Sequence, residues 1–361
     1  MALSFLANTT SVYHAHQSLL TAPMTGTGMT VYLWEWFVLG AVVLALILFD
    51  LFGHVRKAHE PTIKEAAIWS CIYISLAVAF GISLLVRHGS RFATEYFAGY
   101  ITEYSLSLDN IFVFIIIIAA FKVPRIYQQK VLMYGIVIAL ALRFVFILLG
   151  AALVERYIWV FFIFGAWMLY TAIKQIIDGV QEIRERDSNH ELSEEYEPNF
   201  TTRLISKYVP TTDGYVGDRL ITRHAGKTMI TPLLLCIVSI GSVDLMFALD
   251  SIPAIYGLTK EPFIVFAANS FALLGLRQMF FLIDGLLEKL IYLHFGLAAI
   301  LGFIALKLVL HASHGYGYLE AIPEPSIIFS VAFIIVAILI TVIVSVLGAK
   351  RIEARSSNTA E

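Results

Sequence analysis

Residues 242–254 read SVDLMFALDSIPA, and this stretch decides the fold. It places Asp244, Asp250 and Pro253 inside a segment that is otherwise apolar enough to cross a bilayer. A carboxylate at membrane depth is tolerated where it faces a bundle interior, a partner or a cavity, so it indicates a functional site. The two aspartates are therefore the first candidate residues.

An earlier stretch repeats this polar pattern. Residues 101–114 read ITEYSLSLDNIFVF. In both stretches an acid is followed after five residues by a second acid, and then by a small polar residue. The members are Glu103, Asp109 and Asn110 in the first stretch and Asp244, Asp250 and Ser251 in the second.

The composition indicates an all-α polytopic membrane protein. The 361 residues are 59% hydrophobic and 14% charged, with a mean hydropathy of +0.80, whereas soluble domains carry about 25% charged residues. The two cysteines, Cys71 and Cys236, lie in apolar runs, so we expect no disulfide framework and no Cys-based metal site. The sequence contains no nucleotide-binding signature. We expect no tightly bound cofactor.

Nine apolar segments predict about nine transmembrane helices. Each is near the twenty or so residues that span about 30 Å of hydrocarbon. They lie at about 32–52, 66–86, 96–121, 130–152, 157–177, 230–256, 262–283, 289–310 and 326–348. The transporter domain would thus cover 32–348, between a non-cytoplasmic tail at 1–31 and a cytoplasmic tail at 349–361.

The distribution of lysine and arginine predicts the orientation. With the N-terminus outside, 18 of the 25 fall in inside loops and the tail, 5 fall outside and 2 within spans. Positive charges favour the cytoplasmic side. We therefore expect an integral protein of the bacterial plasma membrane with its N-terminus outside and its C-terminus in the cytoplasm.

The loop at about 178–229 is the one sizeable hydrophilic segment, and its charge-rich first part is typical of a solvated helix extension and linker. A regulatory role is the alternative. Near its end, residues 219–230 have apolar positions on both sides of Ala225 and Gly226, which predicts a short β-hairpin.

Residues 96–177 and 230–310 share further features, which indicates an internal repeat. Arg143 is echoed by Arg277, each in an Ala/Gly-Leu-Arg triplet followed by Phe-rich sequence. Three spans per unit is an odd number, so the second unit enters the membrane from the opposite side. Such inverted repeats are typical of secondary transporters, whose ions bind near the bilayer midplane.

The spacing also predicts a site geometry. Six residues of helix advance about 9 Å and turn about 240°, so two acids of one helix do not chelate one ion. If the two helices cross antiparallel, Glu103 lies level with Asp250 and Asp109 with Asp244, and four carboxylates converge. Pro253 favours a kink or local unwinding that frees carbonyl groups. Such hard oxygen donors suit Mn²⁺, Ca²⁺ or Mg²⁺.

Four long blocks resemble the TerC family of integral membrane proteins: EYSLSLDNIFVF (103–114), VLMYGIVIALALR (131–143), FALDSIPAIYGLT (247–259) and PFIVFAANSFALLGLRQMFFL (262–282). The resemblance covers roughly residues 32–348. It implies membership of the lysine-exporter superfamily and Mn²⁺ efflux; the family's name comes from tellurite resistance. It also implies metal-site roles for Glu103, Asp109, Asn110, Asp244, Asp250 and Ser251. Many relatives have a further acid where this chain has Gly241.

Several polar residues have a structural alternative. Asn110, Ser251 and Asn269 are candidate ligands, but buried amides and hydroxyls also form interhelical hydrogen bonds. Asp50, near the inner end of the first span, is a candidate gate or an interfacial acid. We expect Arg143 and Arg277 to act as counter-charges to the carboxylates.

The leading hypothesis is a secondary transporter, not an enzyme, that exports Mn²⁺ in exchange for protons. Ca²⁺ transport, a membrane scaffold linked to tellurite or metal stress, and an intramembrane aspartyl enzyme are the alternatives. The expected partners are a divalent cation, protons and the lipid bilayer, with no nucleic acid, and the oligomeric state is left open. Acids that point into lipid, or that only guanidinium groups hold, would contradict the exporter hypothesis.

Overall fold

The computed structural model describes residues 23–25, 28–53, 62–187, 210–212, 214–224, 227–283, 292–319 and 321–359. Long helices dominate these residues: α2 (Leu33–Gly53), α3 (Ile63–His88), α4 (Ser90–Ala120), α5 (Arg125–Arg156), α6 (Val160–Asp187), α8 (Pro232–Tyr256), α9 (Pro262–Ile283), α10 (Leu293–Gly315) and α11 (Ile327–Thr359). Two antiparallel hairpins pair β1 (Pro23–Thr25) with β2 (Thr30–Tyr32), and β3 (Ile221–His224) with β4 (Lys227–Ile230).

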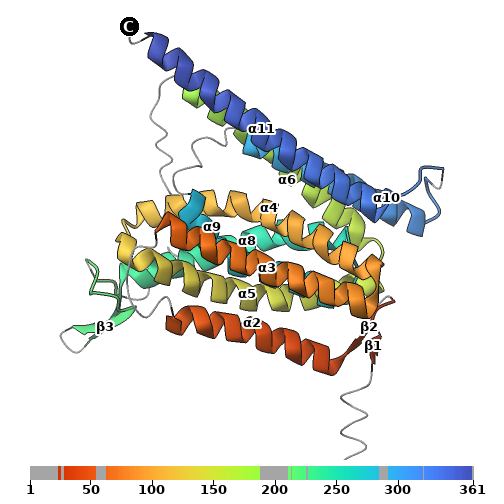
Figure 1. Cartoon of the computed structure of the whole chain (residues 1–361), viewed down its shortest axis with the longest axis horizontal. Coiled ribbons are helices and arrows are strands. Elements are labelled where there is room, and N and C mark those ends of the chain that lie inside the picture. The colour runs from red at the N-terminus through yellow and green to blue at the C-terminus, as the bar shows by residue number, and fades with distance from the viewer. Residues whose placement is uncertain are drawn as a thin grey trace, which may run out of the picture.

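The prediction of an all-α polytopic membrane protein is confirmed, and each predicted apolar segment overlaps one helix. Within the described residues, eight helices are long and apolar enough to cross a membrane. The remaining predicted span corresponds to α4, which has 31 residues and follows α3 after a single glycine. With 31 residues, α4 is long enough to cross the same layer, and it runs alongside α3 and α5 in one block (Figure 1).

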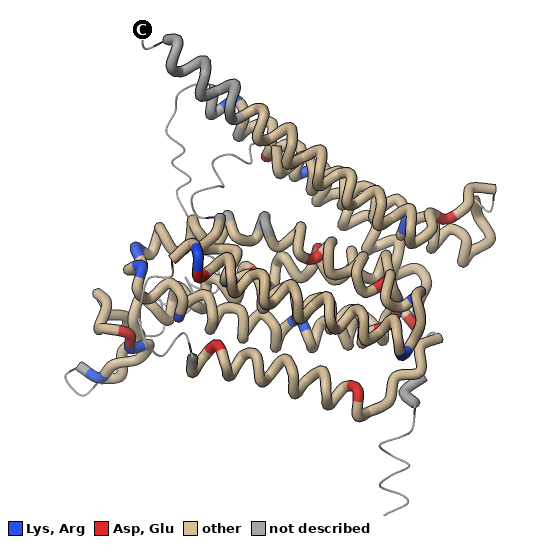
Figure 2. The backbone as a smooth tube through the Cα atoms, in the orientation of Figure 1, with Lys and Arg blue, Asp and Glu red and all other residues tan. Residues whose placement is uncertain are grey.

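The helices form two groups (Figure 1). Helices α2, α3, α4, α5, α8 and α9 run roughly side by side as one block, and α6, α10 and α11 cross this block at an angle. Contacts between α6 and α10 and between α10 and α11 hold the second group together, and α4 and α8 carry much of its contact with the block. Lysine and arginine gather mostly near helix ends (Figure 2). The orientation of the termini stays a prediction.

Helix α9 is the centre of the block. Its membrane-length window is 100% buried, against 22% for α2 and 17% for α11. It packs on α3, α4 and α5, and a helix that is apolar on all sides is stable in such surroundings. Any polar side chain of α9 is therefore enclosed by protein, whereas α2 and α11 present most of their surface to lipid.

Helices α5 and α8 approach closely through two glycines. A Cβ added at Gly135 of α5 would lie 2.7 Å from Cγ2 of Ile240, and one at Gly241 of α8 would lie 2.9 Å from Cγ2 of Ile138. Small residues allow such approaches between helices in lipid. Gly241 therefore contacts α5, and an acidic side chain at this position would require Ile138 to move.

The packing of the helices has the pattern that a two-fold repeat requires. Helix α4 packs on α9, α8 packs on α5, and α6 packs on α10. Exchanging α4–α6 with α8–α10 leaves these three pairings unchanged. The inverted repeat itself stays a prediction.

The predicted hairpin at 219–230 is confirmed: β3 and β4 pair in antiparallel register, from Ile221 opposite Ile230 to His224 opposite Lys227. Tyr215, just before it in the chain, donates its hydroxyl to the carbonyl oxygen of Phe121 at 2.6 Å. This contact fixes the segment to the end of α4. We call this end of the molecule, where α2 ends and α3 begins, the hairpin end (Figure 1).

Of the kink or local unwinding expected at Pro253, the unwinding is not seen, because α8 continues as α-helix to Tyr256. Proline lacks one backbone N–H and so removes one bond of the ladder. Here it lies three residues before the end of the helix, where losing that bond does not break the segment. Among the described residues, Asp244 and Asp250 thus belong to one continuous helix.

Candidate functional site

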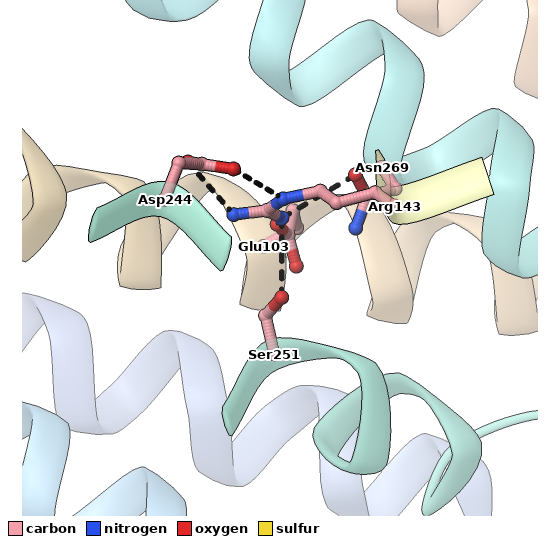
Figure 3. Close-up of polar contacts among 5 residues, drawn as sticks. All are labelled: Glu103, Arg143, Asp244, Ser251 and Asn269. Atoms are coloured by element: carbon pink, nitrogen blue, oxygen red, sulfur yellow. Dashed lines mark hydrogen bonds and ion pairs between the residues drawn. The ribbon is translucent and has the colours of Figure 1, made fainter. Parts of the chain in front are cut away.

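Arg143 of α5 lies at the centre of a buried cluster (Figure 3). Its Nε and Nη2 donate to the two carboxylate oxygens of Asp244 in α8, at 2.9 and 3.1 Å. Its Nη1 donates to Oε1 of Glu103 in α4, to Oγ of Ser251 in α8 at 3.1 Å and to Oδ1 of Asn269 in α9 at 3.3 Å. The guanidinium group therefore joins four helices.

Helix geometry explains the convergence within α8. Asp244 and Ser251 are seven residues apart, which is about two turns, so both face Arg143. The Asp244 carboxylate receives two parallel N–H donors, the strong arrangement for this pair of groups. None of the five side chains of the cluster is more than 2% exposed. The cluster is therefore a polar centre enclosed by packed helices.

The charges of the cluster do not balance. Glu103 and Asp244 contribute two carboxylates and Arg143 one guanidinium group, which leaves a formal charge of −1. Among the described residues, Oε2 of Glu103 and Nδ2 of Asn269 have no hydrogen-bond partner. Because an unpaired charge is costly away from water, a proton or a cation near Glu103 would stabilise the cluster.

Asp250 does not join this cluster. It is six residues after Asp244, so it points to another side of α8. Its Oδ1 accepts hydrogen bonds from Nε1 of Trp167 at 2.7 Å and from Oγ1 of Thr171 at 3.0 Å, both in α6. Glu103 and Asp250 therefore do not converge: Glu103 shares Arg143 with Asp244 and with Ser251, the residue next to Asp250. Asp250 instead connects the block to the second group of helices.

Arg277, the counterpart of Arg143 in the second unit, binds a different acid. Its Nη2 donates to Oδ1 of Asp50 in α2 at 2.8 Å, and the two side chains are 2% and 1% exposed. Asp50 lies near the end of α2, at the hairpin end. The structure thus contains a second buried ion pair, between α2 and the central helix α9.

The four-carboxylate convergence is not seen in the described part of the chain. Asp109 is in α4, but its side chain lies outside the described residues. Asn110 is buried, and no hydrogen bond between described residues links it to Arg143. The described residues contain no group of three or more His, Cys, Asp or Glu that could hold a metal ion. One result that would contradict the exporter hypothesis was that only guanidinium groups hold the acids. This result holds for Asp244, because Arg143 occupies both of its carboxylate oxygens.

Further buried acids, Glu35 and Glu95 among them, escaped the sequence reasoning. Glu35 of α2 accepts from His88 Nε2 at 2.9 Å and from Arg87 Nη2 at 3.0 Å, and Glu95 of α4 accepts from Oγ1 of Thr259. Both lie at the edge of an apolar segment, which is the signal that could have found them. They hold together the end of the molecule opposite the hairpin end.

Comparison with known proteins gives a consistent result. The family model of the integral membrane protein TerC family matches residues 88–353. An uncharacterized membrane protein of Mycobacterium tuberculosis is 46% identical over 279 residues, 77% of this chain and 68% of the relative. The thylakoid membrane protein TERC of Arabidopsis thaliana is 41% identical over 251 residues, 70% of this chain and 62% of the relative.

A third relative, from Escherichia coli, is named "Putative membrane-bound redox modulator Alx" and is 35% identical over 291 residues, 78% of this chain and 86% of the relative. No solved structure matches the chain. The family model covers well over half of the 361 residues. The chain therefore belongs to the TerC family of integral membrane proteins.

Proposed function

We propose that this protein is a secondary transporter that moves a divalent metal ion, with Mn²⁺ as the candidate, out of the cytoplasm in exchange for protons. The observation that carries the proposal is the excess of negative charge around Arg143: two buried carboxylates face one guanidinium group. Such groups inside a membrane protein are costly and are typical of ion or proton pathways.

The donor set supports a hard cation. Glu103 and Asp244 supply carboxylate oxygens, Ser251 a hydroxyl and Asn269 an amide oxygen, and all four side chains surround the Arg143 guanidinium group (Figure 3). Oxygen donors of this kind suit Mn²⁺, Ca²⁺ and Mg²⁺ better than Zn²⁺ or Cu⁺. The choice of Mn²⁺ over Ca²⁺ rests on the family resemblance and is part of the proposal.

Arg143 would act as an internal competitor of the metal. Its guanidinium group uses both oxygens of Asp244 and one of Glu103, the atoms that a bound metal would need. Metal binding therefore requires the guanidinium group to withdraw, and metal release allows it to return. A proton on Glu103 would neutralise the remaining negative charge when the metal has left, which couples metal exit to proton entry.

The arrangement of the helices offers a way to expose the cluster to either side. Helices α6, α10 and α11 form a group apart from the block, and Asp250 of α8 bonds to Trp167 and Thr171 of α6. Alternating access in inverted-repeat transporters arises from rocking of one group of helices against the other. We propose that these two hydrogen bonds break and form during that motion. The proposed orientation has the N-terminus outside.

Flux measurements in liposomes that contain only this protein test the proposal. We expect outward transport of Mn²⁺ with opposite movement of protons, and loss of both in E103Q and D244N. D218N is the matched control, because it removes an exposed carboxylate that pairs with Lys130 at the hairpin end. Absence of any divalent-ion flux, or full flux in E103Q and D244N, would refute it. A parallel measurement with Ca²⁺ decides between the two ions.

The name of the Escherichia coli relative favours a second candidate, a modulator of redox state. Among the described residues the free thiols are Cys71, exposed on α3, and Cys236, buried in α8. A thiol-based function predicts that C71S/C236S abolishes the redox phenotype of a producing cell. The transporter proposal predicts that this variant retains metal flux.

A further inference from the structure

The buried side-chain atoms that lack hydrogen-bond partners are all found on three helices, within the part of the chain that the structure describes. These helices are α3, α4 and α9, which pack on one another. The atoms are Ser70 Oγ, Tyr73 Oη, Glu103 Oε2, Ser107 Oγ, Asn269 Nδ2, Ser270 Oγ, and Nε and Nη1 of Arg277. The surrounding core offers no comparable group on α5, α8 or α10 among the described residues.

Helix spacing places these atoms in sequence along the three-helix interface. Ser70 and Tyr73 are three residues apart, Glu103 and Ser107 four, and Ser270 and Arg277 seven, so each pair shares one face of its helix. On each of the three helices, unpaired polar atoms therefore recur along one face. Isolated packing defects would not produce this pattern.

The series has two defined ends. Asn269 lies at the Arg143 cluster, to which it is hydrogen-bonded. Arg277 lies eight residues further along α9, which is about 12 Å towards the hairpin end, and there it binds Asp50. Tyr73 lies beside this pair, and its hydroxyl is close enough to the Asp50 carboxylate to interact with it, although no hydrogen bond of ordinary geometry joins the two.

The chemistry of the atoms identifies the ligand that suits them. Asn269 and Arg277 offer donors, Glu103 offers an acceptor, and the serines offer both. An anion would be repelled by Glu103, and a resident metal ion by Arg277, whereas water can donate and accept at each position. Each unpaired buried polar atom costs roughly 1–3 kcal/mol, and buried waters with two to four polar partners remove that cost.

We propose that water fills a track between α3, α4 and α9 and links the Arg143 cluster to the Asp50–Arg277 pair. The track is the route by which protons or the cation travel between the cluster and the hairpin end, which the charge distribution assigns to the cytoplasm. This role rests on the proposed function, but the presence of water in the track does not. At the hairpin end, the ion pair between Asp50 and Arg277 closes the track.

X-ray radiolysis of the unmodified protein tests the track, because hydroxyl radicals formed from bound water oxidise adjacent side chains. Tyr73 and Tyr256 are a matched pair, each 2% exposed. The Tyr256 hydroxyl donates to the carbonyl oxygen of Ile147 at 2.6 Å and lies off the track. We expect Tyr73 to be oxidised at least fivefold faster than Tyr256, and equal slow oxidation of the two would overturn the proposal.

Thiol labelling provides a second measurement. In a C71A/C236A background, S107C and S270C should react with iodoacetamide at least tenfold faster than S239C, because alkylation needs a thiolate and thus water. Ser239 is a fully buried serine of α8 that donates to the carbonyl oxygen of Leu235. If S107C and S270C react as slowly as S239C, the track is absent even where metal flux is found. If they react fast and no metal moves, the track stands and the proposed cargo is wrong.

Discussion

Replacing Arg143 by methionine should destabilise the protein strongly, because it removes the cation that pairs with both Glu103 and Asp244. Methionine keeps much of the side-chain volume but provides none of the five hydrogen bonds that the guanidinium group donates. Breaking a buried ion pair by removing one partner costs about 3–5 kcal/mol. At about 2–4 °C per kcal/mol, we expect the unfolding temperature of purified R143M to fall by roughly 10 °C.

A double-mutant cycle separates electrostatics from packing. In the wild-type background, D244N should destabilise, since the guanidinium group loses its bidentate partner. In the R143M background the same change removes one of two uncompensated carboxylates, so it should stabilise or be neutral. The effect of D244N thus changes sign, and the coupling is expected for side chains in direct contact. The account is refuted if D244N lowers the unfolding temperature equally in both backgrounds. As a control, D218N should change the unfolding temperature equally in the wild-type and R143M backgrounds.

Three further changes test the packing, the link between the helix groups and a surface pair. G241A should cost about 1–3 kcal/mol of stability through its contact with Cγ2 of Ile138, and thermal unfolding should show a smaller cost of G241A in an I138A background, which lacks that atom; a neutral G241A would contradict the close approach. D250A should abolish flux and lower stability because Trp167 loses its acceptor, whereas D250N should retain stability, and a D250N variant as unstable as D250A would show that charge rather than hydrogen bonding matters there. The Lys130 ammonium hydrogen-bonds to the Asp218 carboxylate and lowers its pKa, so this stabilisation is present at neutral pH and is lost as the pH falls through the lowered pKa; the small difference in stability between D218N and wild type at pH 7 should shrink as the pH falls below the usual range of an aspartate pKa, and an opposite trend would contradict the assignment.

The fold was largely accessible from the sequence because lipid admits few alternatives. A membrane-spanning backbone must satisfy its polar groups internally, so a run of about twenty apolar residues predicts a helix directly. The hairpin around Ala225 and Gly226 followed from similarly local information. The separation of α6, α10 and α11 from the other helices did not, because it depends on contacts between segments far apart in the chain.

The sequence predicted most residues of the site, but it predicted their arrangement less well. The acids of residues 101–114 and 242–254 stood out because carboxylates are rare at membrane depth. Their partners depend on how α4 and α8 rotate against α5, which the spacing does not determine. The spacing therefore predicted that all four carboxylates converge, whereas Arg143 brings Glu103 together with Asp244 and leaves Asp250 to Trp167.

Isolated residues on α9 explain the remaining difference. Asn269 was a candidate ligand, and the structure places its amide oxygen on Arg143. Arg277 was expected to balance the acids of the motifs, but it binds Asp50 of α2, a helix outside both predicted repeat units. The sequence repeat therefore did not predict that Arg143 and Arg277 bind equivalent acids, because α2, which supplies the partner of Arg277, lies outside both repeat units.

Proton release upon metal binding tests the central claim most directly, because the claim is that buried carboxylates exchange protons for a divalent cation. Titrating purified protein with Mn²⁺ by calorimetry, in buffers of different ionisation enthalpy, measures the protons displaced for each ion bound. The account predicts Mn²⁺ binding with proton release in the wild type, and loss of both in the E103Q/D244N variant. Binding without proton release, or binding that this variant retains unchanged, would contradict it.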